Sequence, residues 1–168
     1  ADAAPQARPQ AKGRHRQVTT PRHITIDEMV ADIEARLTDL GVFESVNHCQ
    51  ATRFADVIDA IGFINRFPAA LVLIGPAEYP AETPRAPAQR IRIMQVALLI
   101  VGAFSADFDK GTGATWDLVD RVDRAFMPTA AAPRTAITLD GVIYHPLKID
   151  PVDVGENRSA YVLTLEAV

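Results

Sequence analysis

The stretch from Arg66 to Phe104, RFPAALVLIGPAEYPAETPRAPAQRIRIMQVALLIVGAF, decides how this chain folds. It holds two long apolar segments, AALVLIG at 69–75 and the second half of QRIRIMQVALLIVGAF at 89–104. A continuous apolar run of this length is typical of a strand that is buried on both faces of a sheet. The two segments therefore predict central strands of one sheet.

A proline-rich insert, 76–89, separates these two strands. Proline fixes φ and lacks an N–H donor, so we expect this insert to stay outside the inner part of the sheet. The strand that follows begins with alternating basic and apolar residues and is long enough to project beyond the sheet. The pattern predicts a stiff, exposed hairpin with a basic end. Its candidate contact residues are Pro80, Pro84, Arg85, Pro87, Arg90 and Arg92.

Three helices are predicted around the sheet. The clearest, TIDEMVADIEARLTDLG, has an apolar stripe at helical spacing, and Thr25 with Glu28 forms a capping-box pattern. A shorter helix is expected over 54–61. A third is expected within 114–127, with Thr115 as its possible N-cap, after a turn at 105–113.

The remaining segments predict further strands. VFESVNHC at 42–49 is a short strand, and SAYVLTLEAV at 159–168 is a closing strand. Asp140-Gly141 between alternating segments is a strong hairpin signal. Mixed helices and antiparallel strands indicate an α+β fold. We expect one small domain at 23–168, with a mixed or antiparallel sheet flanked by about three helices and a protruding loop at 76–89.

Charge is distributed unevenly along the chain. The first 22 residues carry five basic residues and one acidic residue, whereas the whole chain has a net charge of −4, so the remainder carries −8. The basic residues of this arm include Arg8, Lys12, Arg14 and Arg16. The arm lacks hydrophobic periodicity, so it is either a disordered tail or a segment that orders on a partner. The mild overall charge gives no argument for bulk binding to DNA or membrane.

Cysteine usage and apolar runs indicate where the protein works. A single cysteine, Cys49, cannot form a disulfide within the chain. The N-terminus has no signal-like apolar stretch, and the longest apolar run, 96–104, is far shorter than the ~20 residues that span a bilayer. We expect a protein made in the cytoplasm, with no membrane contact.

Catalytic and ligand-binding motifs are missing from the sequence. There is no Walker motif, no GxSxG elbow and no recognisable nucleic-acid-binding motif. His48 and Cys49 are neighbours on a predicted strand and would point to opposite faces, so they make a poor metal pair. Asp107 and Asp109 match only the start of a calcium loop. We expect no enzyme, no cofactor and no metal.

The order of these elements resembles that of a known family. IDEMVADIEARL, FPAALVLIG, a variable loop, IRIMQVALLIVGAF, WDLVDRVDRAF and SAYVLTLEAV together resemble the tail terminator proteins of tailed phages over roughly 24–168. The Mu-like prophage branch is closest, and the lambda gpU type is more distant. The resemblance is one of pattern and element order. The basic arm lies outside it.

The resemblance implies a structural protein of the virion. Tail terminators are α+β subunits that form a hexameric ring on the head-proximal end of the tail tube. They end tube polymerisation and present the surface that joins the tail to the neck. The implied partners are the tail tube protein, the last sheath ring in a contractile tail, a head-completion or neck protein, and DNA that passes through the lumen. Assembly would take place in the host cytoplasm.

Two hypotheses follow about surfaces of such a ring. A proline-stiffened hairpin loses little entropy on docking, so 76–89 with its arginines would reach a neighbouring subunit, the tube or the sheath. An acidic lumen would repel DNA phosphates. The candidate lumen residues are Asp107, Asp109, Asp117, Asp120 and Asp123.

Three other functions stay open at this point. A head-completion or neck protein would also be small, α+β and ring-forming. A small-molecule-binding or enzymatic α+β domain would instead show a concave pocket with convergent polar groups. A contractile injection particle without a head would use a similar cap on its tube.

Overall fold

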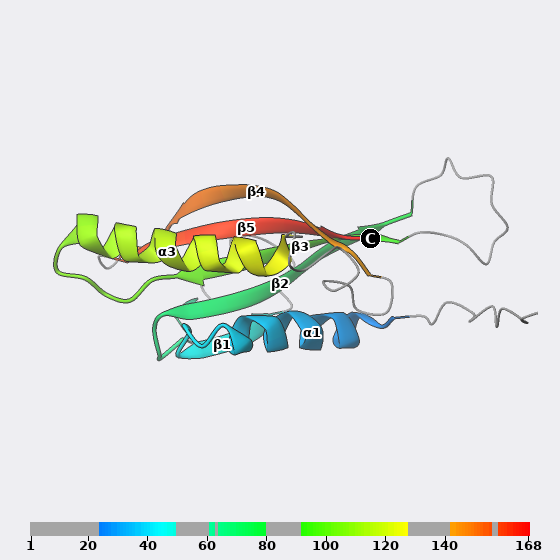
Figure 1. Ribbon diagram of the computed structural model, residues 1–168, viewed down its shortest axis with the longest axis horizontal. Coiled ribbons are helices and arrows are strands. Elements are labelled where there is room, and N and C mark those ends of the chain that lie inside the picture. Colours follow the sequence, from blue (N-terminus) through cyan, green and yellow to red (C-terminus); the bar gives the residue numbers. More distant parts are fainter. Residues whose placement is uncertain (1–23, 50–60, 63, 80–91, 128–141, 156–157) are drawn as a thin grey trace, which may run out of the picture.

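A computed structural model describes residues 24–49, 61–62, 64–79, 92–127, 142–155 and 158–168. These residues form two helices and five strands (Figure 1). In chain order the elements are α1 (Ile26–Asp39), β1 (Ser45–Cys49), β2 (Ala69–Glu78), β3 (Ile93–Val101), α3 (Phe108–Phe126), β4 (Tyr144–Asp153) and β5 (Ser159–Ala167).

The five strands form one mixed sheet in the order β1-β2-β3-β5-β4. β1 runs parallel to β2, and every other neighbouring pair is antiparallel. Figure 1 shows α1 beside β1 and α3 running along β5. The predicted α+β class with a mixed sheet in one small domain is therefore confirmed.

Both faces of the central strands are buried. On one face, Val72, Leu98 and Leu163 join the packing residues of α1 and α3 in the larger apolar cluster. On the other face, Leu71 and Leu99 belong to a second cluster. All of 69–73 is buried, as the continuous apolar run predicted.

The first helix has the predicted capping box. The Glu28 N–H donates to Thr25 Oγ1 at 3.2 Å, and the Thr25 N–H donates to Glu28 Oε2 at 2.9 Å. Most of the apolar stripe is buried against the sheet. Ile26 is the exception, because its side chain is 42% exposed. The first residue of the stripe is therefore exposed at the surface instead of packing in the core.

The helix α3 begins earlier than the sequence predicted. Asp107 is its N-cap and accepts from the Lys110 N–H, so the expected turn at 105–113 is wrong. Thr115, predicted as the cap, is buried inside the helix. One of the glycines that suggested a turn, Gly111, serves packing, because a Cβ there would stand 2.6 Å from the Ser105 Cβ. Tertiary contact has outweighed the low helix propensity of glycine.

The ends of the two central strands also differ from the prediction. β2 continues to Glu78, so residues 76–78 of the predicted loop belong to the sheet. Pro76 is tolerated because, among the described residues, β1 pairs with 69–73 alone and leaves β2 at an edge there, and because the β2–β3 register shifts between Ile74 and Ala77. β3 begins at Ile93, just after Arg92.

Some predicted elements lie outside the described residues. They are 54–60, which is most of the predicted second helix, and the hairpin turn at Asp140-Gly141. The described residues hold two of the roughly three expected helices. Neither of these two helices has the length and apolar character needed to cross a membrane.

Candidate assembly surfaces

The two edges of the sheet carry different surfaces. At one edge, the short strand β1 lies beside α1. At the other edge, β4 lies next to β5, along which α3 packs. Exposed apolar side chains lie at both edges: Ile26 at the first, and Trp116, Leu147 and Ile149 at the second.

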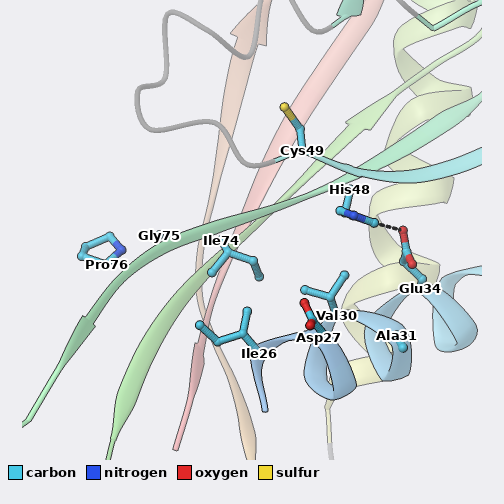
Figure 2. Close-up of a pocket in the computed structure, with 10 residues that line it drawn as sticks. All are labelled: Ile26, Asp27, Val30, Ala31, Glu34, His48, Cys49, Ile74, Gly75 and Pro76. Atoms are coloured by element: carbon cyan, nitrogen blue, oxygen red, sulfur yellow. Dashed lines mark hydrogen bonds and ion pairs between the residues drawn. The ribbon is translucent and has the colours of Figure 1, made fainter.

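A groove opens between α1 and the outer part of β2. β1 ends opposite Leu73, and β2 continues past it, so the wall from Ile74 to Pro76 faces α1 directly (Figure 2). The groove has a volume of about 830 Å³. Its lining residues are Ile26, Asp27, Val30, Ala31, Glu34, His48, Cys49, Ile74, Gly75 and Pro76.

The groove combines an apolar floor with an acidic rim. Ile26, Val30 and Ile74 lie near one another between the helix and the strand (Figure 2). Asp27 and Glu34 come from the same side of α1. Such a groove suits a partner that brings both apolar surface and positive charge.

An ion-pair contact joins the two walls at one end of the groove. Glu34 Oε1 and His48 Nδ1 are 2.9 Å apart (Figure 2). Cys49 points away from α1 and packs with the cluster on the opposite face of the sheet. The predicted divergence of His48 and Cys49 is confirmed, and the described residues contain no cluster of three metal-ligating side chains.

An exposed tryptophan marks the other edge. Trp116 on α3 is 57% exposed, and its indole N–H donates to the hydroxyl of Tyr161 on β5. Leu147 and Ile149 of the neighbouring strand β4 are also exposed. An aromatic side chain fixed by a hydrogen bond loses little conformational entropy on binding, which is a property of interface anchors.

β4 itself is built as a protected edge strand. It carries Pro146 and Pro151 and an ion pair between Lys148 and Asp150 at 2.7 Å. A register shift lies between Pro146 and Lys148. Prolines, charges and bulges discourage strand-to-strand pairing at a sheet edge. A contact at this edge would therefore use side chains rather than an extension of the sheet.

The predicted lumen residues fall on or beside α3. Asp107 caps the helix, Asp109, Asp117 and Asp120 are exposed, and Asp123 is half-buried. Burial, helped by the nearby Asp120, raises the pKa of Asp123. Lys110, Arg121 and Arg124 are interleaved with these acids, so α3 carries four acidic and three basic residues. The channel role stays a prediction, and this mixed charge weakens it.

One of the predicted contact arginines has an internal role. Arg92 Nη2 donates to the carbonyl oxygen of Ile24 at 3.0 Å and ties the start of α1 to the start of β3. The other predicted contact residues lie outside the described residues. They are Pro80, Pro84, Arg85, Pro87, Arg90 and, in the N-terminal arm, Arg8, Lys12, Arg14 and Arg16.

Sequence reasoning missed both the groove and the tryptophan. Ile26 fits the apolar stripe of the predicted helix, so nothing in the neighbouring sequence indicates that its side chain is exposed. Trp116 lies inside the predicted helix 114–127, directly after the buried Thr115, but the apolar pattern did not indicate that its side chain is exposed.

Comparison with known proteins adds no relative. No protein-family model matches the chain, and no curated protein matches its sequence significantly. A functional proposal therefore has to rest on the residues and the fold.

Proposed function

We propose that this protein is a ring-forming structural subunit that caps the head-proximal end of a phage tail tube. It would end polymerisation of the tube, and of the sheath in a contractile tail, and would present the surface that joins the tail to the neck. The proposal rests on the resemblance in element order to tail terminators and on one structural observation. That observation is the pair of unlike surfaces at the two edges of the sheet.

A ring made of one kind of subunit needs such a pair. Each subunit contacts its neighbours head to tail, so two different patches must complement each other. In this chain an open, partly apolar groove lies at the β1–α1 edge, and exposed apolar side chains lie at the β4–α3 edge. Trp116 is the residue that we expect to contribute most to subunit contact.

The tail role supplies the partners and the location. We propose a hexamer, the ring size implied by the resemblance, that contacts the tail tube protein, the last sheath ring of a contractile tail and a head-completion or neck protein. DNA would pass through its lumen without specific binding. The protein would be assembled in the host cytoplasm and reside at the tail–neck junction of the virion.

The decisive experiment is electron microscopy of lysates from a phage that lacks this gene. We expect overlong, headless tail tubes beside filled, tailless heads. Normal-length tails that fail to join heads would instead indicate a head-completion or neck protein. Intact infectious particles would overturn the proposal.

A second candidate function is small-molecule binding. The groove of about 830 Å³ lies within the size range of ligand sites, and Glu34 with His48 supplies polar groups in it. Ligand binding in this groove would not require a ring of subunits. A thermal-shift screen of metabolites that raises the melting temperature of the wild type, but not of Glu34→Gln, would support it.

A further inference from the structure

We propose that the groove between α1 and β2 receives the basic N-terminal segment of this chain, residues 1–22. The proposed function places this groove at one of the two contact edges of a ring subunit but names no segment that fills it, and the proposal here supplies that segment. It stands on the position, charge and apolar character of the groove. It can hold or fail whether or not the protein terminates a tail.

Position is the first argument. The chain enters the described fold at Ile24, whose side chain is buried and whose carbonyl accepts from Arg92. Ile26 and Asp27, only two and three residues later, line the groove. The segment that precedes Ile24 is therefore tethered next to the opening. Tethering raises the effective concentration of a binding segment.

Charge complementarity is the second argument. The helix α1 carries five acidic residues and one basic residue, for a net charge of −4. The segment 1–22 carries five basic residues and one acidic residue, for a net charge of +4. The other helix is a poorer match, because α3 has four acidic and three basic residues. Attraction between opposite charges therefore favours α1 over α3.

Apolar fit is the third argument. The segment contains prolines at 5, 9 and 21 and five alanines, and its charged side chains are mostly arginines. Proline and alanine lose no side-chain entropy when they are buried. Arginine can lay its aliphatic stem on apolar surface while its guanidinium reaches a carboxylate. These properties match a floor made by Ile26, Val30 and Ile74 below the carboxylates of Asp27 and Glu34.

Disulfide trapping in the full-length chain tests the proposal. Cys49→Ser removes the native thiol, Gln10→Cys places one in the segment, and Ala31→Cys places one in the groove, where Ala31 is exposed. The matched control carries Ala114→Cys instead, an exposed alanine on α3. A segment that docks in the groove holds its thiol beside position 31 and so raises the effective concentration of the thiol there. We therefore expect the groove pair to form its disulfide about tenfold faster than the control pair.

Trapping rates measured in charge variants and at high salt make the test specific. Asp27→Asn with Glu34→Gln should slow trapping at Ala31, and so should high salt, because both weaken the charge attraction. Asp117→Asn with Asp120→Asn on α3 should leave it unchanged. Melting curves confirm that each variant is folded.

The product also identifies the copy that supplies the segment. A disulfide within one chain assigns the segment to its own groove, and a covalent dimer assigns it to the groove of a neighbouring copy. Either product supports the segment as the occupant. Equal trapping rates at Ala31 and Ala114 would overturn the proposal. So would a trapping rate at Ala31 that is unchanged when the carboxylates of Asp27 and Glu34 are removed.

Discussion

Tyr144, the first residue of β4, donates a hydrogen bond of 2.8 Å to Oδ2 of Asp32 on α1, 112 residues earlier in the chain. The same carboxylate oxygen accepts from Arg36 Nε at 2.9 Å. The ring of Tyr144 packs edge-on against Phe126 of α3, with the ring centroids 5.6 Å apart. One buried tyrosine thus connects both helices to the last hairpin of the sheet.

Removing this hydroxyl should weaken the fold. In Tyr144→Phe the ring packing stays and the hydrogen bond to a charged acceptor is lost. We expect the free energy of unfolding to fall by about 2 kcal/mol. Urea denaturation at pH 7 measures the change, and Tyr79→Phe, an exposed tyrosine, is the control. An equal effect of the two substitutions would contradict the role assigned to Tyr144.

The same residue should make stability depend on alkaline pH. Burial, together with the hydrogen bond to Asp32, raises the pKa of Tyr144 above its ordinary value of 10.0. The folded state therefore keeps this proton while the unfolded state loses it above pH 10. The stabilisation is fully present below pH 10 and is lost as the pH rises, by about 1.4 kcal/mol per pH unit. Melts of wild type and Tyr144→Phe between pH 9 and 11.5 should converge.

Asp123 should be a site where a neutral side chain stabilises the protein. Burial and the nearby Asp120 raise its pKa, and a negative charge near the end of α3 opposes the helix dipole. We expect Asp123→Asn to gain roughly 0.5 kcal/mol at pH 7. Because a raised pKa stabilises the protonated form, the gain should vanish below pH 3.8, where wild-type Asp123 is also neutral in both states. Urea melts at pH 7 and pH 3 test this, and an equal effect of Asp123→Asn at the two pH values would contradict it.

Two glycines should respond in opposite directions to alanine. A Cβ at Gly102 would stand 2.1 Å from Thr115 Oγ1, which itself donates to the Gly111 carbonyl. Overpacking of this kind costs about 1–3 kcal/mol. At Gly113, inside α3, a Cβ meets no atom within 4 Å, so alanine should stabilise the helix by about 0.5–1 kcal/mol. Thermal melts of the two variants should therefore shift in opposite directions.

Trp116 should matter for assembly more than for the subunit fold. Its side chain is largely exposed, so Trp116→Ala should change subunit stability by about 0.5 kcal/mol or less. If Trp116 anchors subunit contact, the same change should abolish ring formation and tail joining in a phage complementation assay. Met127→Ala, another exposed apolar residue, is the control. If the Trp116→Ala phage gave wild-type titres, the β4–α3 edge would not be part of the subunit interface.

Much of the fold could be predicted because hydrophobic period and capping act locally. Thr25 and Glu28 are three residues apart, and the run 69–73 needs only its own sequence to indicate burial on both faces. The start of α3 could not be predicted in this way. A Cβ at Gly111 would clash with Ser105, and Thr115 is buried beside Gly102; such contacts between distant residues are not visible in a local pattern.

The candidate surfaces were harder to predict for a related reason. A groove exists where two elements fail to cover one another, here because β1 stops opposite Leu73 while β2 continues. That difference in strand length depends on register across the sheet. The predicted contact residues, in contrast, were chosen for charge and proline content. Arg92 shows the limit of that choice, since it donates to Ile24 within the fold.

The burial of β3 on both faces has a consequence for how the molecule opens. Its amides are paired with β2 on one side and β5 on the other, while β1 and β4 each have one neighbour among the described strands. The outer strands can therefore fray one at a time without disturbing the centre. In deuterium, the amide protons of β3 should be the last to exchange, and they should do so only when the whole domain unfolds.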